Sequence, residues 1–118
     1  MPVLEECEVV DVTMSPELLE LVADRFKALG DPARLRILSA LRQGERTVTE
    51  LVSATGLSQA NVSKHLALLL RLAFVRRRRS GPYTYYALAD RAVFRLCDVM
   101  CGRIEKELQK QNRAVAGP

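Results

Sequence analysis

The sequence has little of what catalysis usually requires. Its 118 residues include one histidine, His65, and show no nucleophile paired with a base, no glycine-rich phosphate loop and no paired-carboxylate motif. No apolar run approaches the length that spans a bilayer, and the first charges, Glu5 and Glu6, do not fit a secretory signal. We therefore expect a cytoplasmic protein that is not an enzyme and has no membrane partner.

Cysteine is also scarce, since Cys7, Cys97 and Cys101 are the only three. In a reducing compartment we expect them to be thiols that act as ligands, sensors or core residues. A disulfide framework would need an oxidising environment.

Charge of each sign is concentrated in a different part of the chain. Residues 1–20 hold six acidic residues and no basic one, whereas the rest holds 18 lysines and arginines against eight acids. A basic body suits a polyanionic partner, although it can equally serve solubility alone. Residues 1–14 lack helical periodicity and are predicted to form a flexible acidic arm, and residues 113–118 a disordered tail.

Between these ends lies one predicted domain, residues 15–112. Four stretches begin with a capping residue and continue with apolar residues at helical spacing: Ser15 to Gly30, Asp31 to Gly44, Thr47 to Gly56, and Ser58 onward. The stretch "FVRRRRSGPYTYYAL" then predicts a β-hairpin, and Asp90 precedes a long amphipathic helix. The predicted fold is mainly α with a small β-hairpin, in the order α-α-α-α-β-β-α.

The third and fourth helices have the spacing of a helix-turn-helix, across "ATGLSQANVSKHL". Val62, Leu66 and Leu69 can hold one face of the fourth helix against the body. The opposite face is slim and rich in hydrogen-bonding groups, as entry into a DNA major groove requires: Ser58, Gln59, Ala60, Asn61, Ser63 and Lys64. An ordinary amphipathic helix with a polar solvent face would show the same division into an apolar and a polar face.

Four consecutive arginines in the hairpin favour DNA binding over that alternative: Arg76, Arg77, Arg78 and Arg79. Their side chains alternate between the two faces of a strand, and the guanidiniums repel one another unless anions neutralise them. A phosphate backbone or a minor groove supplies such anions. We therefore expect these arginines to contact DNA.

Three segments together resemble the ArsR/SmtB family of metal- and stress-responsive repressors: "ALGDPARLRIL", "ELVSATGLSQANVSKHLALL" and "RRRRSGPYTYYAL". The likeness extends from about Leu18 to Leu108. It implies a winged helix-turn-helix homodimer that binds a palindromic operator in double-stranded DNA until an effector releases it. It also implies that the first and last helices form the dimer interface, that the helix from Ser58 reads bases, and that the hairpin is the wing.

The ligand sets that other members of that family carry are missing here. The helix before the turn has no cysteine pair, and the last helix has no histidine. His65 lacks cysteine or carboxylate neighbours one turn away, so we expect it to bond a phosphate or another side chain rather than a metal.

Cys97 and Cys101 remain as the sensor candidates. One helical turn apart, their Cβ atoms lie about 6 Å from each other, too far for a relaxed disulfide but close enough to share a soft ion. With Cys7 as a third sulfur, the site would suit As(III) best, with Cd(II), Pb(II) or Zn(II) as further candidates. Two alternatives stay open: a thiol-redox or persulfide-responsive repressor, and a constitutive DNA-binding protein with structural cysteines.

Overall fold

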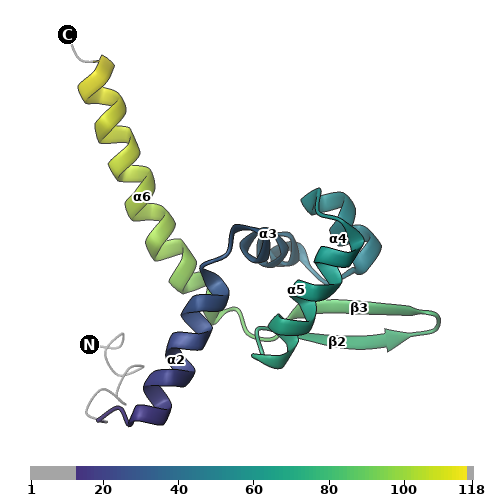
Figure 1. The fold of residues 1–118 in the computed structure, drawn as a ribbon. Helices are drawn as coiled ribbons and strands as arrows, with labels where there is room; N and C mark the ends of the chain where they lie inside the picture. Colours follow the sequence, from purple (N-terminus) through teal and green to yellow (C-terminus); the bar gives the residue numbers. More distant parts are fainter. Residues whose placement is uncertain (1–12, 117–118) are drawn as a thin grey trace.

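The structure is a computed structural model that describes residues 13–116, and Figure 1 shows its fold. Its elements are α2 (Pro16–Leu29), α3 (Pro32–Ala40), the 3-10 helix η2 (Leu41–Gln43), β1 (Arg46–Thr47), α4 (Val48–Thr55), α5 (Gln59–Arg71), β2 (Val75–Ser80), β3 (Tyr83–Leu88) and α6 (Ala92–Ala116). Helices α2 to α5 precede the hairpin and α6 follows it, which confirms the predicted fold class.

The predicted helix starts are also confirmed by their caps. The Ser15 Oγ accepts a hydrogen bond from the Leu18 N–H at 3.1 Å, and Asp31 accepts one from the Ala33 N–H at 2.8 Å. Thr47 and Glu50 form the reciprocal capping box that their spacing indicates. Each cap satisfies N–H groups that the first helical turn leaves without partners, so helix starts can be recognised locally.

Three boundaries differ from the sequence expectation. The second helix tightens into η2 after Ala40, before Gly44 takes a φ of 139°. The two-residue strand β1 was not predicted; it pairs with Tyr85 and Tyr86 and gives a three-stranded sheet in the order β1-β3-β2. Helix α6 extends to Ala116, beyond the expected start of the tail at residue 113, because the first helix breakers in that stretch are Gly117 and Pro118.

One hydrophobic core joins α3, α4 and α5 to the base of the hairpin. Leu51, Val62 and Leu69 are completely buried there, and Val75 and Leu88 pair across the two strands at its edge. The core holds α5 in place, because one face of this helix packs against the other helices and its remaining surface is exposed to solvent.

Helix α6 leaves this body and extends away from it, as Figure 1 shows. Phe94 anchors its first turn in the core. Asp98 accepts two hydrogen bonds from Arg42 of η2, at 3.0 and 3.1 Å. Among residues 13–116, no helix combines the length and apolarity that crossing a membrane would require.

Candidate nucleic-acid interface

The turn between α4 and α5 has the geometry of a helix-turn-helix. Gly56 ends α4 with a left-handed φ of 76°, and its N–H donates to the Val52 carbonyl at 3.0 Å. Ser58 caps α5 by accepting a hydrogen bond from the Asn61 N–H at 3.1 Å. Leu57 packs against the core between them. The three residues Gly56–Ser58 thus reverse the chain and fix the direction in which α5 starts.

Helix α5 presents two chemically distinct faces. Val62, Leu66 and Leu69 are at most 1% exposed. The face predicted to read DNA is exposed along its whole length: Ser58, Gln59, Ala60, Asn61, Ser63 and Lys64. The structure therefore leaves all six residues accessible, and the Ser58 hydroxyl oxygen also serves as the cap.

His65 connects α5 to α3. Its Nδ1 accepts a hydrogen bond from the Arg34 Nε at 3.2 Å, while the Arg34 Nη1 donates to the Ala28 carbonyl at 3.0 Å. This confirms the expectation of an intramolecular hydrogen bond. The sequence offered no signal for the partner, since Arg34 lies 31 residues away. The bond links α5 directly to α3.

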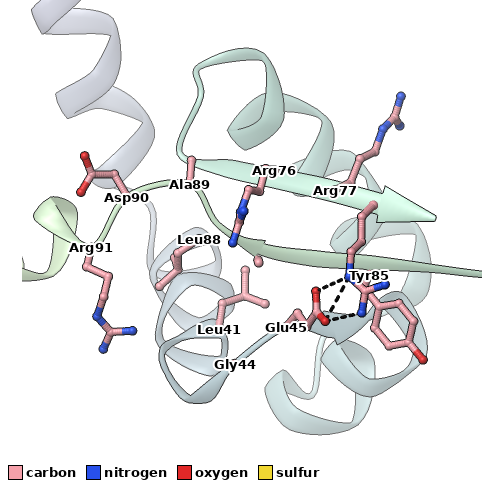
Figure 2. Close-up of a pocket in the computed structure, with 12 residues that line it drawn as sticks. Leu41, Gly44, Glu45, Arg76, Arg77, Tyr85, Leu88, Ala89, Asp90 and Arg91 are labelled. Carbon is pink, nitrogen blue, oxygen red and sulfur yellow. Dashed lines mark hydrogen bonds and ion pairs between the residues drawn. The ribbon is translucent and has the colours of Figure 1, made fainter. Parts of the chain in front are cut away.

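The hairpin divides the four arginines between its two faces. Val75 is buried, so Arg77 and Arg79 share its face, toward the core and α5, whereas Arg76 and Arg78 lie on the opposite face. Figure 2 shows Arg76 and Arg77 pointing to opposite sides of the strand. The two-residue turn at the tip is closed by Gly81, whose φ is 60°.

Arg78 is bound to another part of the chain. Its Nε donates to both carboxylate oxygens of Glu45, at 3.2 and 3.0 Å, its Nη2 donates to the same carboxylate, and its guanidinium lies 4.9 Å from the centre of the Tyr85 ring. The hydrogen bonds from Arg78 hold the pKa of the Glu45 carboxyl below its usual value. Arg78 is therefore less available to an external phosphate than its neighbours are.

The two cysteines of α6 are free thiols; Cys97 is half-buried and Cys101 is exposed. Burial raises the pKa of the Cys97 thiol, and nearby Cys101 and Asp98 raise it further, while the Arg42 guanidinium acts in the opposite direction. No group of three histidine, cysteine, aspartate or glutamate side chains within residues 13–116 is arranged to hold a metal ion. Cys7, the predicted third sulfur, lies outside the described residues.

Helices α2 and α6 expose large apolar side chains. On α6 these are Leu96, Val99, Met100, Ile104 and Leu108, each 45–66% exposed, and on α2 the most exposed is Phe26 at 57%. The apolar stripe predicted for the last helix is thus present, but beyond its first turns the described chain leaves it uncovered. Such a continuous apolar surface is typical of a protein interface.

Comparison with known proteins agrees with this geometry. Residues 31–77 match the family described as "Bacterial regulatory protein, arsR family". A transcriptional repressor SmtB homolog from Synechocystis is 41% identical over 83 residues, which cover 70% of this chain and 63% of that protein. This chain therefore matches less than two thirds of that relative's length.

Two solved structures share the fold. One is a homodimeric winged helix-turn-helix DNA-binding domain from Mycobacterium bovis, from a possible ArsR-family transcriptional regulator. It has a TM-score of 0.71 and 36% identity, covering 80% of this chain and 87% of that one. The other is the antimony-specific transcriptional repressor AntR, with a TM-score of 0.71 and 31% identity, covering 83% and 89%.

Proposed function

Because the chain belongs to the ArsR family of bacterial regulatory proteins, we propose that it is a homodimeric repressor that binds a palindromic operator in double-stranded DNA. The observation that carries this proposal is α5 and its cap, whose six predicted reading residues are all exposed while Val62, Leu66 and Leu69 are at most 1% exposed. A helix held in this way can enter a major groove without losing its own packing.

Each exposed side chain of α5 has a chemical role in this proposal. Gln59 and Asn61 carry amides that can pair bidentately with the edge of adenine, and Ala60 leaves room for close approach or contacts a thymine methyl. Ser63 and Lys64 can donate to bases or to phosphates. The Arg34–His65 hydrogen bond supports readout by holding these side chains in register with α3.

The wing supplies the phosphate contacts. We assign them to Arg77 and Arg79, which lie on the α5 side of the hairpin. Arg78 is neutralised by Glu45, and Arg76 faces the other way, so their contributions to DNA binding are smaller. Of the four arginines expected to contact DNA, we therefore propose that two make the main phosphate contacts in each protomer.

The uncovered apolar surface of α2 and α6 supports a dimer. A second copy would bury side chains such as Phe26, Met100 and Ile104, which are 45–60% exposed in one chain. Two α5 helices related by a two-fold axis would then read half-sites about one helical turn of DNA apart, which is why a palindromic operator is expected.

We assign the inducer site to Cys97 and Cys101. Thiolates prefer soft ions, and the relative AntR is described as antimony-specific, which supports a thiophilic metalloid such as As(III) over a hard cation. Cd(II), Pb(II) and Zn(II) remain candidates. Two sulfurs leave such an ion under-coordinated, so Cys7 of either protomer is the proposed third ligand.

Release would work by linkage between the cysteines and the DNA-reading body. Asp98 lies next to Cys97 and is bound to Arg42 of η2, which is continuous with the core that carries α5. An ion that binds better when α6 is repositioned would shift the dimer toward that arrangement and away from DNA. The coupling free energy required is typically about 1–3 kcal/mol.

The DNA-binding proposal is tested with a duplex that the wild-type protein selects from a random-sequence pool. Gln59→Ala should weaken binding to the selected duplex by about 1–3 kcal/mol. The same variant should bind random duplex nearly as tightly as the wild-type protein does. Gln111→Ala, an exposed residue of α6, is the matched control and should change neither affinity. If selection yields no consensus, or if Gln59→Ala weakens both duplexes equally, α5 does not read the sequence.

The inducer proposal is tested by titrating As(III), Sb(III), Cd(II), Pb(II) and Zn(II) into the protein–operator complex and following DNA release by anisotropy. We expect As(III) or Sb(III) to release DNA, and Cys97→Ser or Cys101→Ser to abolish release while DNA affinity is kept. If mild oxidation releases DNA and no ion does, the thiol-redox alternative is correct. If neither has an effect, the protein binds DNA constitutively.

A further inference from the structure

A groove of about 590 Å³ lies beside the hairpin, and Figure 2 shows its lining, which includes Arg76, Arg77 and Arg78. The strand register pairs Arg76 with Ala87 and Arg78 with Tyr85, so these four residues share one face of the hairpin. The loop at Gly44–Glu45 borders the groove on one side, and residues 89–91, which lead into α6, close one end. The volume falls within the range of about 300–1,000 Å³ that small-molecule sites occupy.

The groove carries positive charge that the described chain does not neutralise. Its two carboxylates are already engaged, because Glu45 binds Arg78 and Asp90 accepts a hydrogen bond from the Ala92 N–H at 2.8 Å. Arg76 and Arg91 form no ion pair within residues 13–116. Figure 2 shows the Arg76 side chain directed into the groove and Asp90 directed away from Arg91.

The floor beneath these guanidiniums is apolar. Leu41 and Leu88 are 2% and 8% exposed and line the groove together with Ala87 and Ala89. A charge anchor above a small apolar floor matches an anion with a compact hydrocarbon body better than a bare inorganic ion. A DNA phosphate is a poorer fit, because it brings no compact apolar body that could lie on this floor.

We propose that this groove binds a small organic carboxylate, with Arg76 as its anchor. The carboxylate accepts hydrogen bonds from the Arg76 guanidinium, and its apolar body lies over Ala87, on the same face. Arg91 adds positive potential at the end next to α6. The site lies on one protomer and is separate from both α5 and the cysteines, so it does not depend on the repressor function.

The test uses the full-length, DNA-free protein labelled with ¹⁵N, and benzoate as the probe. Benzoate should shift the Arg76 Nε–Hε resonance and the Ala87 and Leu88 amides in a saturable way, whereas benzamide, its neutral match, should not. Arg76→Gln should weaken benzoate binding roughly fivefold or more, and Arg76→Lys should weaken it less. Arg103→Gln, which changes an exposed arginine of α6 that does not line the groove, should leave it unchanged.

Three results would overturn the proposal: no saturable shift with benzoate, inorganic phosphate binding as tightly as benzoate, or Arg103→Gln weakening binding as much as Arg76→Gln. The first means that the groove is not a site. The second means that the apolar floor contributes nothing, and the third that only general charge is involved. The same spectra report whether each variant is folded, so loss of binding is distinguished from loss of structure.

Discussion

Removing Arg77 and Arg79 should flatten the salt dependence of DNA binding, whereas removing Arg78 should change it much less. All three residues are exposed and follow one another in the chain, so the sequence alone gives no reason to expect different contributions from them. The structure distinguishes them, because within residues 13–116 only Arg78 is held by a carboxylate of its own chain, that of Glu45. The comparison therefore tests the wing assignment and the intramolecular ion pair together.

The expected magnitude follows from counterion release. Each phosphate that a protein neutralises contributes about 0.9 to the slope of log K against log salt. In a dimer, Arg77→Gln removes two contacts and should reduce the slope by about 1.8, and the double variant with Arg79→Gln by about 3.6. Arg78→Gln should reduce it by less than about 0.9, because a phosphate contact from Arg78 would leave Glu45 without its partner.

Fluorescence anisotropy with a labelled operator, measured over a series of KCl concentrations, gives the slope for each variant. Glu45→Gln is the complementary control: it frees Arg78 and should steepen the slope relative to wild type. Thermal unfolding checks that the variants remain folded. If Arg78→Gln reduces the slope as much as Arg77→Gln, the ion pair does not restrain Arg78 in the complex. If the double variant keeps the wild-type slope, the wing does not contact phosphate.

Three further predictions concern the fold and helix α6. Gly56→Ala should lower the free energy of unfolding in urea by about 1–2 kcal/mol, because φ is 76° there, whereas helical Gly102→Ala should cause no loss. Thr47→Ala removes a capping box and should cost about 1 kcal/mol in the same assay, so an unchanged midpoint would exclude a stabilising cap. The raised pKa of Cys97 should shift its iodoacetamide alkylation profile to higher pH than in the urea-unfolded chain, and Arg42→Leu should shift it further. Because this folded-state pKa exceeds the unfolded one, the thiol's contribution to stability is complete at neutral pH and declines as pH rises through the folded-state pKa. If the pH profile of Cys97 alkylation is the same in the folded and the urea-unfolded chain, folding does not raise the pKa of this thiol.

Most of the fold could be predicted because its signals are local. Caps at Ser15, Asp31 and Ser58, and the left-handed turn at Gly56, involve residues within about one helical turn of each other, so their spacing is visible in the sequence. Strand β1 was missed because two residues carry no periodicity, and their pairing with Tyr85 and Tyr86 depends on a hairpin almost forty positions later.

The exposed polar face of α5 could be predicted for the same reason, since residues on one helical face recur at a known period. The individual roles of the arginines could not. Sequence alternation separates Arg76 and Arg78 from Arg77 and Arg79, but it does not reveal which pair faces the core or that Glu45 lies within reach of Arg78.

What the sequence determined by itself is therefore the set of elements, their caps and the two-faced character of α5 and α6, all of which depend on neighbours along the chain. Tertiary structure alone decided the contacts Arg78–Glu45, Arg34–His65 and Arg42–Asp98, whose partners are 33, 31 and 56 residues apart. It also decided that residues 13–116 leave the apolar stripe of α6 uncovered. Such contacts depend on how the packed core orients whole helices and strands relative to one another. The spacing of residues along the chain does not contain that information.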